Sequence, residues 1–123
     1  MVISVFGKPA DAPLDATSRR RYCNFLHYVL VRIPFRDVAI WNEANSPQFW
    51  PRSAGAPAYE ALLAACWRRL HGLRPDVNII STTAAHHDPA GFMRLLGKTY
   101  QQRGRTRPIL DTFAHNPYPE NAS

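Results

Sequence analysis

The stretch Asp37-Val-Ala-Ile-Trp-Asn-Glu-Ala-Asn-Ser-Pro-Gln-Phe-Trp-Pro51 decides the expected fold. It begins with a short apolar run over residues 38–41, which is typical of a strand buried on both faces of a parallel sheet. The run stops at Asn42 and Glu43, so a carboxylate is expected at the carboxyl end of that strand. Parallel barrels and open α/β sheets carry their chemistry at this edge. A loop cap or an ion pair with an arginine explains Glu43 equally well on the local pattern alone.

Strands and helices alternate on both sides of this stretch. The expected strands are residues 2–6, 38–41, 76–81 and 108–113. Between them, apolar residues recur at helical spacing over residues 22–30, 59–70 and 92–100. The order predicts an α/β fold with four parallel strands and three helices, built from strand-helix-strand units. No glycine-rich phosphate loop follows any strand, so the sequence gives no support to a nucleotide-binding fold.

Residues 41–45, Trp-Asn-Glu-Ala-Asn, resemble the Trp-Asn-Glu-Pro-Asn signature of clan A glycoside hydrolases, the cellulase-like (β/α)8-barrel enzymes. In that family the signature ends the fourth strand. The resemblance implies that Glu43 is the general acid/base and that Asn42 binds the sugar 2-hydroxyl. Ala44 stands where the family usually has Pro, and Ala does not fix φ as Pro does. The two residues that carry the chemistry are unchanged.

The resemblance extends along the chain and implies a partial TIM (β/α)8 barrel. Residues 2–6 resemble strand three, residues 78–81 resemble strand five, and residues 111–119 resemble strand six. A complete barrel takes roughly 250 residues, whereas this chain has 123. We therefore expect residues 1–123 to be a single segment from the middle of a catalytic barrel. On this interpretation strands one and two precede Met1, and the nucleophilic Glu of strand seven lies beyond Ser123.

The chemistry implied is hydrolysis of O-glycosyl bonds by the retaining mechanism. That mechanism needs two carboxyl groups about 5–5.5 Å apart, a proton donor and a nucleophile. Glu43 suits the donor. The candidates for the nucleophile inside the chain are poor: Asp111 is expected within the last strand, Glu60 on a helix and Glu120 in the tail. The isolated chain is therefore expected to be inactive.

The expected sugar contacts follow the same edge of the sheet. They are Trp41, Asn45, Trp50, His115 and Tyr118. Trp50 can stack on a sugar face or, equally well, pin the loop by packing. The spacing His115-Asn116-Pro117-Tyr118 is longer than the His-x-Tyr-Pro exit of strand six in the family. The main alternative is a non-catalytic carbohydrate-binding α/β domain, which would keep Trp50 and Tyr118 but would not need Glu43.

Composition limits the partners. The net charge of +6 comes mostly from arginine clusters at residues 19–21, 68–69 and 103–107. These clusters could attract nucleic acid or an acidic glycan, but they lack interleaved aromatic platforms, so solvated surface charge is the favoured interpretation. An oligo- or polysaccharide is the expected partner, with self-association through exposed strand edges. Nucleic acid and membranes are not expected partners.

The remaining signals are weak. His86 and His87 adjoin an expected strand end, but no third ligand stands at metal-site spacing, so no metal and no cofactor is expected. Cys23 and Cys66 are expected to be two buried thiols. The chain shows no secretory signal and no apolar run long enough for a membrane span.

Overall fold

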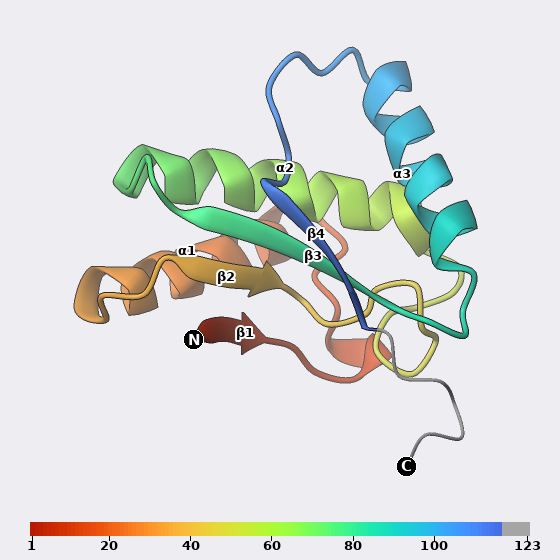
Figure 1. The fold of residues 1–123 in the computed structure, drawn as a ribbon, viewed down its shortest axis with the longest axis horizontal. Coiled ribbons are helices and arrows are strands. Elements are labelled where there is room, and N and C mark those ends of the chain that lie inside the picture. The colour runs from red at the N-terminus through yellow and green to blue at the C-terminus, as the bar shows by residue number, and fades with distance from the viewer. Residues whose placement is uncertain (117–123) are drawn as a thin grey trace.

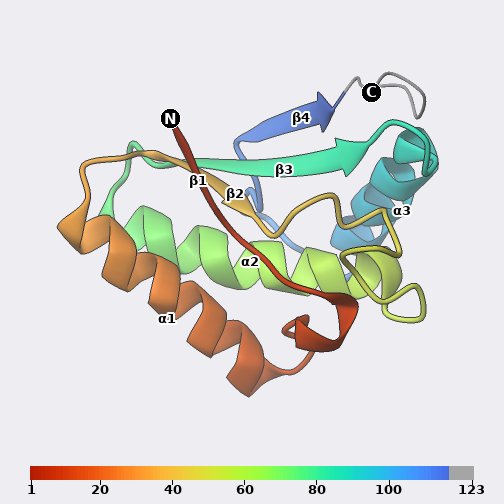
Figure 2. The ribbon, with the colours of Figure 1, turned by 90° about the horizontal axis from the view of Figure 1, so that it is seen from below.

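The computed structural model describes residues 1–116, which form one parallel sheet with three helices against one of its faces (Figures 1 and 2). The strands are β1 (Val2–Val5), β2 (Asp37–Ile40), β3 (Asn78–Ala84) and β4 (Thr112–Asn116). The helices are α1 (Ala16–Arg32), α2 (Gly55–Leu73) and α3 (Pro89–Gln102), with a short 3-10 turn η1 (Pro9–Asp11) before α1. The strands lie side by side in the order β1-β2-β3-β4, and every neighbouring pair is parallel. The predicted α/β architecture is confirmed, and it has the arrangement of part of a β/α barrel.

Capping residues define where two of the helices begin. Asp15 caps α1, because its carboxylate accepts the backbone N–H of Ser18 at 2.7 Å. Asp88 caps α3, and its carboxylate accepts the N–H of Gly91 at 3.1 Å. The pyrrolidine of Pro89 then occupies the first turn, where no hydrogen-bond donor is needed.

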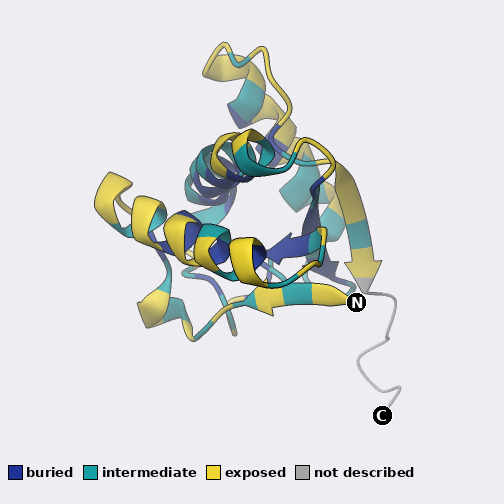
Figure 3. Ribbon diagram, turned by 90° about the vertical axis from the view of Figure 1, so that its left-hand side faces the viewer, coloured by how far each residue is buried: buried dark blue, intermediate teal, exposed yellow. Residues whose placement is uncertain are grey.

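The hydrophobic core lies between the sheet and the helices (Figure 3). Val38 and Ile40 of β2 are fully buried and belong to this core. The apolar residues on one side of α2 belong to it as well. The α2 residues are Tyr59, Leu62, Leu63, Cys66 and Leu70. Their spacing of three and four residues puts them on one side of the helix, which is the pattern that predicted a helix over residues 59–70. Burial of this apolar surface is the main stabilising contribution to the fold.

The last strand begins later than the sequence predicted. β4 covers Thr112–Asn116 rather than residues 108–113, and its register pairs Thr83 with His115. Ile109, expected in the strand, lies in the preceding loop and fills the core. A short apolar run cannot by itself distinguish a buried loop from a buried strand. The shift puts Asp111 at the amino end of β4, before its first residue.

Cys23 and Cys66 are buried as predicted, but the prediction that they are thiols is wrong. Cys23 of α1 and Cys66 of α2 form a disulfide, with their Cα atoms 4.9 Å apart. Both cysteines belong to the buried stripes of their helices. The two stripes pack against the same core, and this brings the sulfur atoms within bonding distance. Nothing in the local sequence around either cysteine indicates the pairing.

The described sheet has two edge strands, β1 and β4. Figure 3 shows both of them with exposed and partly exposed residues, in contrast to the central strands. Val2 and Phe113, one on each edge strand, are 52% and 42% exposed. None of the helices formed by residues 1–116 is long and apolar enough to span a membrane.

Candidate functional site

The candidate site lies where β2 ends, and its backbone is unusual. Trp41 has φ 59° and Glu43 has φ 43°, so two non-glycine residues on either side of Asn42 adopt the left-handed conformation. That conformation is uncommon for residues with a side chain, and for a bulky one such as Trp it is an outlier. Such residues cost on the order of 1–3 kcal/mol each and persist only where surrounding contacts hold them.

Two buried tyrosines hold the end of β2. The hydroxyl of Tyr22 accepts the N–H of Trp41 at 2.8 Å and donates to the carbonyl of Val5 at 2.6 Å. The hydroxyl of Tyr59 donates to the carbonyl of Ile40 at 2.6 Å. Burial raises the pKa of both tyrosines above the usual range, so both hydroxyls stay protonated and can donate. α1 and α2 thus fix the conformation from which Asn42 and Glu43 project.

Glu43 is half-buried and is tied to the neighbouring strand through its backbone. Its N–H donates to the hydroxyl of Thr82 on β3 at 3.0 Å, and its carbonyl accepts the N–H of Ser46 at 2.8 Å. The side chain of Asn42 is also half-buried, and within residues 1–116 its amide makes no hydrogen bond to another residue. A carboxylate and an adjacent amide are therefore held at the carboxyl edge of the sheet, as predicted, where the amide can reach a ligand.

Asn45 was predicted to contact sugar, but its amide is already used within the protein. Its Nδ2 donates to the carbonyls of Ala84 at 2.9 Å and His87 at 3.1 Å, and its Oδ1 accepts the N–H of Ala84 at 2.8 Å. Both amide hydrogens and the oxygen are satisfied by backbone groups. Asn45 joins the loop after β2 to the loop after β3, which is a structural role.

The two tryptophans of the stretch are packing residues in this structure. Trp41 is 3% exposed and Trp50 is 1% exposed. The indole N–H of Trp50 donates to the carbonyl of Gly55 at 2.9 Å, and the ring lies edge-on between those of Trp41 and Tyr59. A ring that is covered on its faces cannot stack on a sugar. In this structure Trp41 and Trp50 present no open ring face for a sugar, which favours the alternative in which Trp50 pins the loop.

His115 is not placed beside Glu43. His115 is exposed on β4, and its Nδ1 lies 3.2 Å from the hydroxyl of Thr83. Successive side chains of a strand point to opposite faces of the sheet. Thr82, which accepts the backbone N–H of Glu43, therefore points to the opposite face of the sheet from Thr83. His115 is paired with Thr83 and lies on the same face as Thr83. Tyr118 lies outside the described residues.

The other carboxylates considered in the sequence lie elsewhere. Asp111, at the amino end of β4, accepts hydrogen bonds from the N–H of Ile79, the ring of His71 and the indole N–H of Trp67. Burial acts to raise the pKa of Asp111, but these hydrogen bonds outweigh it and hold the pKa below its usual value. Glu60 is fully buried and paired with two arginines. Glu120 lies outside the described residues.

Three aspartates do occur in the loops at the carboxyl edge, but all three cap local turns. Asp11, Asp15 and Asp88 accept the backbone N–H groups of Lys8, Ser18 and Gly91. Within residues 1–116, no group of three or more His, Cys, Asp or Glu side chains is arranged to hold a metal ion. A second carboxylate for Glu43 would therefore come from outside the described residues.

Sequence reasoning did not find the groups that hold the site. Tyr22 and Tyr59 each act on the end of β2 from 19 residues away, and Thr82 acts from 39 residues away. Tyr22 and Tyr59 were recognised only as members of apolar helix stripes. A tyrosine in a buried helix stripe needs a hydrogen-bond partner for its hydroxyl. This need was the one signal in the sequence for a contact with another element.

Comparisons of the chain with protein-family models, with the sequences of curated proteins and with solved structures find no match.

Proposed function

We propose that the chain provides the proton-donor half of a glycoside hydrolase active site, acting on β-linked O-glycosides by the retaining mechanism. The observation that carries the proposal is the position of Asn42 and Glu43. They follow a buried parallel strand and lie in a left-handed turn that is held by two tyrosine hydroxyls. Strained backbone that is held in place by its surroundings is typical of functional sites. The Trp-Asn-Glu motif supplies the reaction class.

The proposed roles follow from the chemistry of glycoside cleavage. The Glu43 carboxyl gives its proton to the glycosidic oxygen while a second carboxylate attacks the anomeric carbon from the opposite face. The Asn42 amide donates a hydrogen bond to a sugar hydroxyl, and this bond strengthens as charge develops on the ring. Water then attacks the covalent intermediate, with Glu43 acting as the base. The second carboxylate belongs to a part of the barrel outside residues 1–116.

A non-catalytic carbohydrate-binding domain is the weaker candidate. Such a domain binds sugar rings on exposed aromatic faces. Of the two aromatic residues that this interpretation keeps, Trp50 is 1% exposed and Tyr118 lies outside the described residues. A binding domain would also not need the turn at Asn42 and Glu43 to be fixed by the tyrosine hydroxyls.

Binding can be tested on the full chain by a nuclear magnetic resonance titration with a β-linked oligosaccharide. We expect the backbone amides of Asn42, Glu43 and Thr82 to shift. Asn42→Ala should weaken binding roughly tenfold, because one good hydrogen bond to the ligand is lost. Gln48→Ala, at an exposed position of the same loop, is the matched control and should bind normally. Chemical-shift changes at other residues that are the same in wild type and in Asn42→Ala would contradict the proposed site.

Hydrolysis needs the complementing strands as well, and can be measured after co-expression of a barrel fragment that carries them. Glu43→Gln should then cripple cleavage of glycosides with poor leaving groups. Substrates with activated aryl leaving groups need less protonation and should lose less in the glycosylation step. Equal, near-wild-type turnover on both kinds of substrate would rule out Glu43 as the acid.

A further inference from the structure

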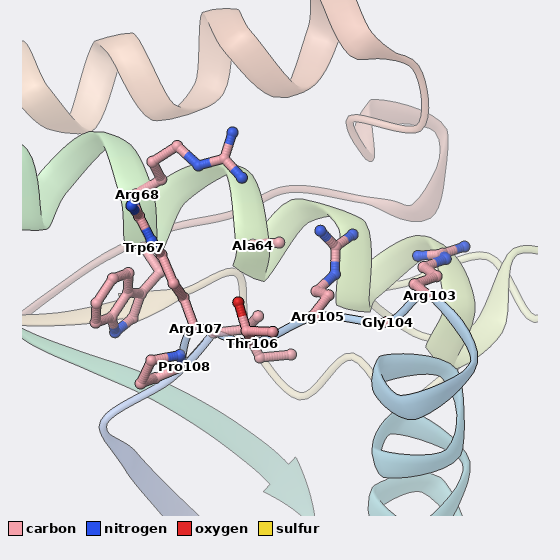
Figure 4. A pocket seen from close by; sticks show the side chains of 10 residues that line it. Ala64, Trp67, Arg68, Arg103, Gly104, Arg105, Thr106, Arg107 and Pro108 are labelled. Carbon is pink, nitrogen blue, oxygen red and sulfur yellow. The ribbon is translucent and has the colours of Figure 1, made fainter.

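A polar pocket of about 280 Å³ lies between α2 and the segment 103–109, which joins α3 to β4 (Figure 4). Trp67 and Arg68 of α2 line one side, and the segment lines the other. In Figure 4 the side chain of Arg107 rises from the segment beside Trp67 toward Arg68. No residue of the stretch 37–51 contributes to this pocket, so it is separate from the candidate glycosidase site.

Two of the arginines that line the pocket are fixed by a buried carboxylate. Glu60 of α2 is 0% exposed, and its oxygens accept hydrogen bonds from Arg103 at 2.6 Å and from both Nε and a terminal nitrogen of Arg105. Arg103 also donates to the carbonyl of Pro57 at 2.9 Å. A carboxylate that is buried and fully hydrogen-bonded holds its partners firmly. The segment is therefore attached to α2 at one end of the pocket.

The other two arginines have no such partner. Within residues 1–116, the guanidinium groups of Arg68 and Arg107 form no ion pair and no hydrogen bond. Four arginines therefore line the pocket and the single carboxylate of Glu60 pairs with two of them, which leaves three positive charges in excess. Figure 4 also shows the hydroxyl of Thr106 pointing toward α2.

We propose that this pocket binds a tetrahedral oxyanion, a phosphate or sulfate group, either free or carried on a sugar. The planar fork of arginine matches the oxygens of such a group and can bind two of them at once. The volume lies below the ~300–1,000 Å³ of pockets for drug-sized ligands, so it suits one anionic group or a small molecule that carries it.

Nucleic acid fits the pocket less well, because it would need an open aromatic face for a base. Trp67 does not offer one: its ring lies 4.0 Å from the ring of His71, and its N–H is bonded to Asp111. The excess charge is also confined to a small pocket rather than spread along a groove that a strand could follow.

Isothermal titration calorimetry of the full chain with inorganic phosphate, and separately with sulfate, tests the proposal. Chloride should replace the anion at matched ionic strength in the reference. We expect one binding site per chain, weakened roughly tenfold by Arg107→Gln and by Arg68→Gln, since each variant removes a charge-assisted hydrogen bond. Arg52→Gln, an exposed arginine outside the pocket, is the matched control and should bind as wild type.

Both variants should fold, because neither guanidinium group makes an internal bond, and equal melting temperatures will check this. A hexose phosphate separates the two sources of the anion. If it binds more tightly than inorganic phosphate, the natural ligand is a phosphorylated sugar, and if it binds equally, the ligand is the free ion. Binding that disappears against matched chloride, or that is equal in Arg107→Gln and Arg52→Gln, would overturn the proposal.

Discussion

Trp41 and Glu43 keep left-handed backbone conformations because groups from three other elements hold them. The hydroxyl of Tyr22 belongs to α1, that of Tyr59 to α2 and that of Thr82 to β3. Each binds a backbone group at or just after the end of β2. A turn fixed from three directions cannot relax toward an ordinary conformation without leaving buried backbone groups unsatisfied. The orientation of Asn42 and Glu43 is therefore a property of the whole core, not of the loop alone.

Removing the Tyr22 hydroxyl tests this dependence. Tyr22→Phe leaves the N–H of Trp41 and the carbonyl of Val5 without the partner that bridges them. We expect a loss of about 1–3 kcal/mol in the free energy of unfolding, measured by urea denaturation. Tyr28→Phe, the same change at an exposed tyrosine of the same helix, should alter stability by less than ~0.5 kcal/mol. Equal effects of the two changes would mean that the bridge does not stabilise the turn.

Asp111 makes a contribution to stability that depends on pH. Its pKa in the folded protein is lowered, because the hydrogen bonds from His71, Ile79 and Trp67 outweigh the opposing effect of burial. A carboxyl with a lowered folded pKa stabilises the fold fully above its unfolded pKa of ~3.9, and this stability is lost as the pH falls through the folded pKa. Asp111→Asn should therefore remove stability at pH 7 and flatten the loss on acidification below about pH 4.

Urea denaturation at a series of pH values from neutral to acidic measures this effect. Asp76→Asn, an exposed aspartate before β3, is the matched control and should keep the wild-type slope. If Asp111→Asn loses as much stability on acidification as the wild type, the hydrogen bonds to Asp111 do not favour its charged form.

At the scale of the elements, the order of strands and helices was predictable because it depends on local patterns. The apolar stripe of α2, the buried run of β2 and the pair Asp88-Pro89 at the start of α3 each express a preference of a few neighbouring residues. The part of the site that was predicted, Asn42 and Glu43 at a strand end, is local in the same sense.

The errors concern contacts between residues far apart in the sequence. The disulfide, the amide bonds of Asn45 to the loop after β3, and the burial of Trp50 against Tyr59 all depend on how elements pack. The late start of β4 has the same origin, since Ile109 is drawn into the core instead of the sheet. The arginines of segment 103–107 were interpreted as solvated charge, because nothing near them in the sequence indicates the buried Glu60.

The disulfide between α1 and α2 gives a prediction at this scale. It closes a loop of 43 residues in the unfolded chain, and such a bond typically stabilises by about 2–4 kcal/mol. The double variant Cys23→Ala/Cys66→Ala should lose roughly that amount, measured by urea denaturation under oxidising conditions. A reducing agent should destabilise the wild type similarly and leave the double variant unaffected. Thiol labelling verifies that the wild-type disulfide is reduced. If the reduced wild type keeps its full free energy of unfolding, the disulfide does not stabilise the fold.

For the molecule as a whole, the sheet formed by residues 1–116 is open. β1 and β4 have a neighbour on one side only, and the helices cover one face of the sheet (Figure 2). A barrel removes such edges by closing, which requires a consistent strand number, tilt and shear. The exposed Val2 and Phe113 mark the two edges where further strands would pair.

We expect the isolated 123-residue protein to self-associate through these edges and to lack hydrolytic activity. Unpaired backbone groups and exposed apolar side chains favour pairing with another copy, although the net charge of +6 opposes it at low salt. Size-exclusion chromatography with light scattering at moderate salt should therefore show a dimer or larger species. Val2→Lys places a charge on the β1 edge and should shift the association equilibrium toward monomer. Phe25→Lys places the same charge at an exposed position of α1 and should leave the equilibrium unchanged.

The expected lack of activity has a separate cause, because residues 1–116 offer Glu43 no suitable second carboxylate. Asp111 lies at the amino end of its strand, and Glu60 is enclosed by arginines. An aryl β-glycoside should remain intact with the isolated chain and be cleaved once co-expressed strands supply the nucleophile and close the sheet. A monomeric 123-residue protein whose turnover is abolished by Glu43→Gln would overturn both expectations. The nucleophile would then have to be sought at Asp88, in the loop after β3, or at Glu120.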